Sequence, residues 1–149
     1  MRTILFKNAA LGLFCLTTIV SLTAAEGPSL DSLQGKWTTK KTNSEGQAYT
    51  QTIEIKKDKL TFKIARADGE VRLVAKANVK TEKLGPFNTL KIFDIEAGSS
   101  MDALQAVNDE RTNIYVLDED QLTMVVNFDK IRDIRKPSMD TYVREGKSK

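Results

Sequence analysis

Histidine is absent from this chain of 149 residues, which also has a single cysteine, three prolines and one tryptophan. Without histidine, neither a Ser-His-Asp nor a Cys-His nucleophile system can form, and a zinc site would need oxygen ligands in place of the usual nitrogen and sulfur. Carboxylate, lysine, tyrosine and arginine groups remain for acid–base chemistry, but no nucleophile, metal or phosphate-loop motif stands out. We therefore expect a protein that is not an enzyme and that uses no cofactor and no metal.

The N-terminal residues have the order of a secretory signal. Arg2 and Lys7 come first, an apolar run covers residues 9–22, and small residues follow at 23–25. The run is shorter than the roughly 20 residues that a transmembrane helix needs. We expect 1–25 to be a signal peptide and 26–149 to be one domain, secreted or periplasmic. A retained N-terminal anchor is the alternative interpretation.

Removal of this segment would change the charge and the thiol content of the chain. Of the 23 Lys and Arg residues, 21 would remain against 20 Asp and Glu, and the cysteine would be lost. A net charge near +1 gives little electrostatic reason for binding nucleic acid or an anionic membrane. We expect no nucleic-acid partner and no stable membrane insertion, and a core that depends on packing alone.

Most of the remaining sequence alternates between apolar and polar residues, as antiparallel strands with one dry and one wet face do. Asp68-Gly69 predicts a type I′ turn, and Gly85-Pro86 separates two further strands. Between residues 89 and 96 the apolar phase shifts, which predicts a β-bulge or a bend. The expected strands are one containing Trp37, then 49–56, 60–65, 71–79, 89–96, 112–117, 121–128 and 138–144.

Two segments depart from this alternation. Ser29 is a candidate N-cap before Leu30 and Leu33, which predicts one helical turn that plugs an end of a barrel. Over 97–109, Ser99 precedes Asp102 by three as in a capping box, and apolar residues recur every third position, which predicts a short helix or a structured loop. About eight strands with turns at each joint, no repeat and no linker favour a single all-β antiparallel barrel.

Several motifs, read together, resemble a family of small lipocalin-like exported domains of planctomycete and related bacteria. They are Gly35-Lys36-Trp37, the strand 90–95, the hairpin 112–124 and the terminal Tyr142-Val143-Arg144. The resemblance spans nearly all of the mature chain and implies a lipocalin-like barrel, while the biochemical role of that family is undefined. Two differences stand out, an inserted Phe93 and the run Arg135-Lys136-Pro137 in place of Arg-Pro.

The resemblance also implies a structural pair. In lipocalin-type folds a tryptophan packs across the base of the barrel and a basic residue of the last strand lies on its ring. Here these residues are Trp37 and Arg144, and a cation–π contact between them would join the first and last strands as a structural clasp. The alternative is that Arg144 contacts a ligand.

Two clusters of charge have both a functional and a structural interpretation. Asp118, Glu119 and Asp120 could bind calcium through oxygen ligands, or could form a solvated hairpin tip, which is favoured because the EF-hand spacing and glycine are missing. Arg132, Arg135 and Lys136 could receive an anionic group at the mouth of the barrel, or could be a solvated loop.

Two functions stay open at this point. The barrel could hold a small apolar or amphipathic molecule, with candidate ligand-binding residues Phe62, Leu73, Ala75, Ala77, Met124, Arg132 and Arg135. Alternatively, its own side chains could fill the interior, and its surface would bind a protein or cell-envelope partner. The small side chains Ala75 and Ala77 would leave room inside. Residues that could fill the interior are Phe62, Val71, Leu73, Leu90, Ile92, Met124, Val126 and Phe128.

Overall fold

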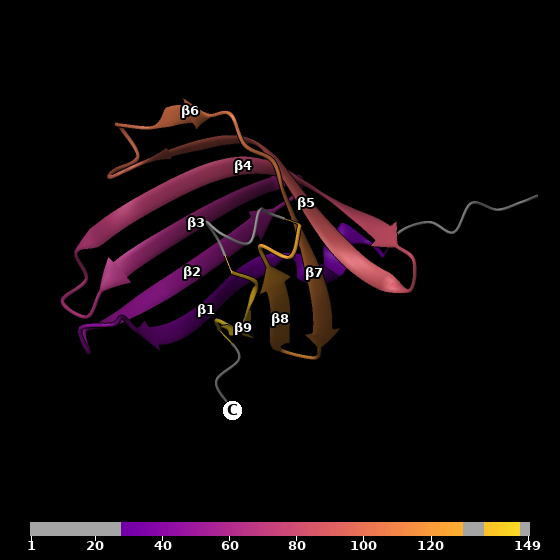
Figure 1. Ribbon diagram of the computed structural model, residues 1–149, viewed down its shortest axis with the longest axis horizontal. Coiled ribbons are helices and arrows are strands. Elements are labelled where there is room, and N and C mark those ends of the chain that lie inside the picture. The colour runs from indigo at the N-terminus through magenta and orange to yellow at the C-terminus, as the bar shows by residue number, and fades with distance from the viewer. Residues whose placement is uncertain (1–27, 130–135, 147–149) are drawn as a thin grey trace, which may run out of the picture.

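The computed structural model describes residues 28–129 and 136–146, and Figure 1 shows that they form one curved, closed β-structure. The signal segment expected at 1–25 and its cleavage point lie outside the described residues. A 3-10 turn, η1 (Leu30–Leu33), is followed by nine strands. They are β1 (Gly35–Thr42), β2 (Ala48–Lys56), β3 (Lys59–Arg66), β4 (Val71–Leu84), β5 (Phe87–Gly98), β6 (Gln105–Val107), β7 (Arg111–Asp118), β8 (Gln121–Val126) and β9 (Ser138–Arg144).

Eight of these strands close into an antiparallel barrel. Their hydrogen-bonded order is β4-β3-β2-β1-β9-β8-β7-β5, and β4 pairs with β5 to complete the ring. The last strand, β9, lies between β1 and β8, so the barrel closes only when the C-terminal strand meets the N-terminal one. The prediction of a single all-β, lipocalin-like antiparallel barrel of about eight strands is confirmed.

For the segment 97–109 two alternatives were predicted, a short helix and a structured loop. The structure has the structured loop. Bends and turns cover 99–103, and β6 then pairs with β5. The reason is that β7 pairs with β5 only as far as Ile92, so the edge of β5 beyond that point needs another partner. A Cβ on Gly98 would lie 2.1 Å from the Ala103 carbonyl oxygen, so this close approach of the loop requires glycine.

Val74, whose position breaks the alternation of its strand, is explained by the same loop. It is 2% exposed although its neighbour Ala75 faces the barrel interior, and its cross-strand partner is Gly98. The loop that packs on Gly98 therefore accounts for an apolar side chain on the outer face.

Two local predictions need correction. The connection 67–70 is not a two-residue type I′ turn, because Gly69 has a positive φ of 88° whereas Asp68 does not. The Gly69 and Glu70 backbones instead bond to Arg66, which makes a four-residue connection. In addition, β8 ends at Val126 and not at Phe128, because Asn127 takes a left-handed φ of 59°.

The predicted bulge is present in β5. Lys76 pairs with Glu96 and Asn78 pairs with Phe93, so two residues of β5 lie opposite Ala77 alone. One of the two is Asp94, with a φ of 52°. The bulge turns Ile95 to the interior while Asp94 remains outside and accepts a hydrogen bond from Asn78.

The two ends of the barrel differ. The closed end carries η1 and the turns at 57–58, 85–86 and 119–120, whereas the open end carries the connections 43–47, 67–70 and 99–110 and the described residues 127–129 and 136–137. Side chains in the core cluster include Leu33, Trp37, Ile55, Leu90 and Leu122, all at most 1% exposed. Within the described residues, no helix has the length and apolarity that crossing a membrane requires.

Candidate ligand cavity

The interior of the barrel is hollow between the core cluster and the open end. A cavity of about 310 Å³ is lined by inward-facing residues of β1 to β5 and β7 to β9. This volume lies at the lower end of the range of roughly 300–1,000 Å³ that small-molecule pockets occupy. The apolar part of its wall consists of Ile53, Leu60, Phe62, Ala75, Ala77, Ile92, Ile95, Met124 and Val126.

Two alanines leave this space open. Ala75 is the cross-strand partner of Phe62, and Ala77 is the partner of Leu60, so each methyl group lies beside a large apolar side chain of β3. On the other side, Ala77 faces the bulge that brings in Ile95. A leucine or phenylalanine at either position would project into the cavity.

On one polar wall of the cavity, formed by β1, β2 and β9, the charged and polar side chains pair with one another. Lys41 of β1 forms an ion pair with Asp140 of β9, and these side chains are 27% and 11% exposed. The Tyr142 hydroxyl donates to Gln51 Oε1 at 3.0 Å, a contact that reaches from β9 to β2 across the inner face of β1. Burial, reinforced by the nearby Asp140 carboxylate, raises the pKa of Tyr142 well above its usual value, so this hydroxyl stays protonated.

A second polar wall, on β7, has unused hydrogen-bonding capacity. Arg111 and Asn113 lie two residues apart and both line the cavity. Arg111 Nε donates to Asp109 Oδ2 at 3.2 Å, while its two terminal nitrogens have no partner within 28–129 and 136–146. Asn113 is 6% exposed, and its carboxamide bonds to no other described residue.

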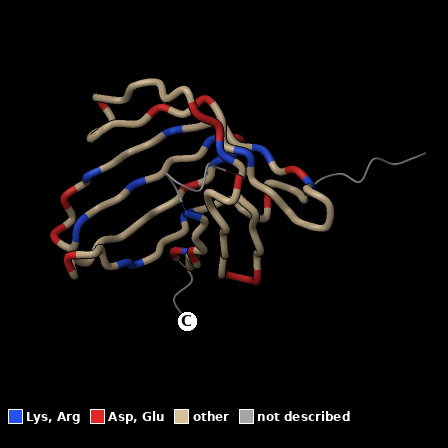
Figure 2. Tube along the Cα trace, viewed as in Figure 1, with Lys and Arg blue, Asp and Glu red and all other residues tan. Residues whose placement is uncertain are grey.

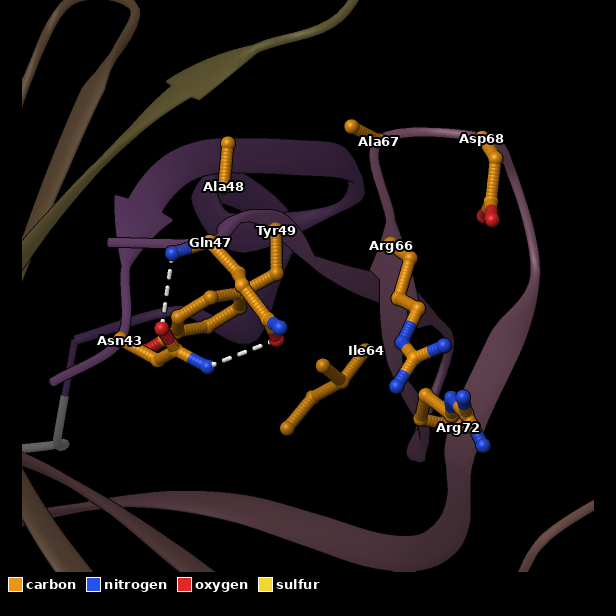
Figure 3. A pocket seen from close by; sticks show the side chains of 9 residues that line it. All are labelled: Asn43, Gln47, Ala48, Tyr49, Ile64, Arg66, Ala67, Asp68 and Arg72. Carbon is orange, nitrogen blue, oxygen red and sulfur yellow. Dashed lines mark hydrogen bonds between the residues drawn. The ribbon is translucent and has the colours of Figure 1, made fainter. Parts of the chain in front are cut away.

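A wider hollow of about 760 Å³ lies at the open end. Figure 3 shows the side chains around it, with Asn43 and Gln47 joined on one side and Arg66 beside Arg72 on the other. Both arginines bond to the Glu70 carboxylate, at 3.3 and 3.1 Å. Tyr49 lies two residues before Gln51 on β2, so the hollow and the cavity are successive levels of one funnel.

The predicted ligand-binding residues are partly brought together. Phe62, Ala75, Ala77 and Met124 line the cavity. Leu73 does not line it, since this side chain pairs with Ile64 one level nearer to the rim. Arg132 and Arg135 lie outside the described residues.

Among the residues expected to fill the interior, Val71 is 42% exposed at the start of β4 and fills nothing. Sequence reasoning missed the polar lining, namely Lys41, Arg111, Asn113, Asp140 and Tyr142. Strand parity would have placed Lys41 inside with Trp37, and Arg111 and Asn113 inside with Tyr115, because each is an even number of residues from that aromatic residue.

Trp37 and Arg144 are in contact at the closed end. The Arg144 guanidinium carbon lies 4.0 Å from the centre of the Trp37 ring, and the two residues are paired in the β1–β9 register. Trp37 is fully buried and donates from Nε1 to the Leu33 carbonyl at 2.9 Å. The ring therefore ties η1 to the barrel as well as supporting the arginine.

Arg144 also bonds beyond the ring. Its guanidinium donates to the Gln34 carbonyl and, at 3.0 Å, to the Ser32 carbonyl, and Nε lies 3.3 Å from Asp120 Oδ1. Gly35 is needed beside it, because its φ is +114° and a Cβ would lie 3.1 Å from an Arg144 nitrogen. These contacts engage Nε and both terminal nitrogens of Arg144 with protein groups.

The acidic tip has a structural contact instead of a metal-like arrangement. Asp120 receives both the side chain of Arg144 and, through its carbonyl, the Arg144 backbone N–H at 2.9 Å. Across 28–129 and 136–146 no three His, Cys, Asp or Glu side chains are grouped so as to hold a metal ion.

Comparisons with protein-family models, with curated proteins and with solved structures gave no match.

Proposed function

We propose that this protein is an exported, non-catalytic barrel that binds a small apolar or amphipathic molecule. The observation that carries the proposal is the hollow half of the barrel: about 310 Å³ remain between the core cluster and the open end, where Ala75 and Ala77 leave space. An apolar group would lie against Phe62, Ile92 and Met124, and a polar head would lie nearer to the rim. A secreted or periplasmic location and membership in the lipocalin-like exported domains belong to the same proposal.

The chemistry of the lining supports binding over catalysis. A general base needs a free acceptor, yet Asp140 is paired with Lys41 and the Tyr142 hydroxyl is committed to Gln51. The raised pKa of Tyr142 makes it a poor proton donor as well. Turnover of an ester, glycoside or phosphate that disappears in Asp140→Asn would contradict the non-catalytic part of the proposal.

The test of binding is to fill the cavity. The mature protein should enhance the fluorescence of 1-aminoanthracene, a small neutral aromatic probe, and Ala77→Phe should weaken this binding at least tenfold because the new ring occupies the space. Ala106→Phe, on exposed β6, makes the same substitution away from the cavity and should leave the affinity unchanged. Equal affinity of the wild type and Ala77→Phe, with both folded by circular dichroism, would rule out the cavity as the binding site.

One observation favours the second function, an interaction module. Apart from Asp118 at the end of β7, the outer face of β7 to β9 carries uncharged side chains, and Figure 2 shows β7 and β8 as largely uncharged strands joined by an acidic turn. Val116, Met139 and Val143 are 62%, 69% and 52% exposed. The strip they form with their neighbours consists of Ile114, Val116, Thr123, Val125, Met139, Thr141 and Val143.

A photoreactive amino acid distinguishes this alternative. At position 116 it should form an adduct with a protein partner in the producing cell, and at position 61, on the outer face of β3, it should not. If this adduct persists in Ala77→Phe while the probe is lost, the surface and the cavity act independently. Absence of an adduct at position 116 would remove the support for the interaction module.

A further inference from the structure

The two polar walls of the cavity differ in what they leave unbonded. On the β1–β2–β9 side, Lys41 pairs with Asp140 and Tyr142 pairs with Gln51, so charge and hydrogen bonds are balanced. On the β7 side, the Arg111 terminal nitrogens and the Asn113 carboxamide have no partner among the described residues. The Arg111 side chain is 43% exposed, whereas Asn113 is 6% exposed, and a buried polar group such as Asn113 costs free energy unless a ligand or water satisfies it.

The unused groups are mostly donors. The terminal nitrogens of the Arg111 guanidinium offer four N–H groups, and Asn113 Nδ2 offers two. Asn113 is more than nine-tenths buried and faces the cavity, whereas Arg111 lies one inward position nearer to the open end. Successive inward positions of a strand are about 6.6 Å apart, so long side chains at both can reach one head group.

Apolar residues surround this donor pair. In the β5–β7 register Arg111 lies opposite Ile92, and Asn113 lies opposite Leu90. Of the charged residues that line the cavity, Lys41 and Asp140 pair with each other, and among the described residues Arg111 pairs with Asp109 through Nε only. The complement of such a wall is an acceptor with negative charge attached to an apolar body.

Building on the proposed function, we propose that the cavity selects a small apolar molecule that carries a carboxylate, and that Arg111 and Asn113 are its specificity-determining residues. The carboxylate accepts hydrogen bonds from the Arg111 terminal nitrogens and from Asn113 Nδ2. The apolar part then lies toward Phe62, Ala75 and Ala77. The outer arginines Arg66 and Arg72 line the wider hollow at the open end and not the cavity, so they do not take this role.

The experiment compares three molecules with one alkyl chain and different heads. Octanoate, 1-octanol and octylamine compete with 1-aminoanthracene on the mature protein at pH 7. Octanoate should displace the probe at a concentration at least tenfold lower than 1-octanol, and octylamine should be the weakest. Arg111→Gln and Asn113→Ala should each weaken octanoate about tenfold and leave 1-octanol unchanged.

The control is Arg72→Gln, which removes the same charge from the open end without touching the cavity lining. It should change octanoate binding less than twofold. An equal loss in Arg72→Gln and Arg111→Gln, or equal displacement by octanoate and 1-octanol, would overturn the carboxylate selection while leaving the binding barrel intact. If none of the three molecules nor the probe binds the wild type, the proposed function itself fails, and the inference fails with it.

Discussion

The closed and open ends of the barrel use the same strands for different purposes. Along β1 the inward side chains run from Trp37 to Lys41, and along β9 from Arg144 through Tyr142 to Asp140. At the closed end these side chains pack against fully buried apolar residues. Toward the open end they line the cavity, where Lys41 and Asp140 pair with each other. The side chains of the core cluster and those that line the proposed binding cavity therefore lie toward opposite ends of the strands, so substitutions at one end should leave the other largely unaffected.

The largest expected effect comes from Trp37→Ala at the closed end. Loss of a fully buried ring, its hydrogen bond to Leu33 and the surface on which Arg144 rests should lower the free energy of unfolding by about 3–5 kcal/mol. Equilibrium urea unfolding measures it. Tyr49→Ala, at the rim of the open end, is the matched aromatic control and should cost less than about 1 kcal/mol. Equal losses would mean that the two ends do not differ in stability.

Arg144→Ala should come next, at about 2 kcal/mol. It removes the contact with Trp37 and the hydrogen bonds to the Gln34 and Ser32 carbonyls, which are left without a donor. Lys36→Ala, which breaks only the exposed ion pair with Glu145, should cost well under 1 kcal/mol. Should Arg144→Ala leave the urea midpoint unchanged but abolish 1-aminoanthracene binding, Arg144 would belong to a ligand site and not to a clasp.

Tyr142→Phe should have a smaller effect that depends on pH. Near pH 8 the loss of the hydrogen bond to Gln51 should cost about 1 kcal/mol. Because burial raises the pKa of Tyr142 above the value of about 10 in an unfolded chain, the unfolded state releases the phenolic proton first. The stability that the wild type owes to this group is thus complete below pH 10 and declines above it. Urea unfolding should show that the difference in the free energy of unfolding between the wild type and Tyr142→Phe is smaller at pH 11 than at pH 8. An equal difference at the two pH values would contradict this.

Tyr115→Phe should have the smallest effect, and of opposite sign. The Tyr115 hydroxyl is buried and has no hydrogen-bond partner in the described part of the chain, whereas the ring belongs to the core cluster. Removing the oxygen should raise the free energy of unfolding by up to about 1 kcal/mol. Differential scanning calorimetry would detect the rise in Tm, with Tyr142→Phe as the comparison in which a bonded hydroxyl is removed. A lower Tm for Tyr115→Phe would show that its oxygen is bonded in solution.

Much of the barrel could be predicted from the sequence because strand alternation depends on neighbouring residues. The strands at 49–56 and 60–65 and the change of phase near Phe93 follow from the pattern of apolar side chains alone. For 97–109 the sequence allows a short helix or a structured loop, and the structure has the loop because the free edge of β5, and not local propensity, determines how that segment pairs. Long-range pairing of this kind is not visible in a local window.

The candidate site was predictable only in part. Ala75 and Ala77 indicated an open interior, and both line the cavity. The donor wall on β7 was missed although Arg111 and Asn113 share the parity of the buried Tyr115, because both residue types are common on protein surfaces. Which polar groups remain unbonded depends on the neighbours of each side chain, and these are set by the order of strands around the barrel.

The clasp between Trp37 and Arg144 has a consequence for the order of events during folding. The two hydrogen bonds that Arg144 donates to the chain before β1 span 110 and 112 residues. A growing chain has no barrel closure until β9 has been made, so the hairpins from β1 to β8 must wait as an open sheet with two free edges. Contacts of such long range slow folding because the loop they close must be ordered first. Barrel closure and the contact between Trp37 and Arg144 can therefore form only after β9, the last strand, has been made.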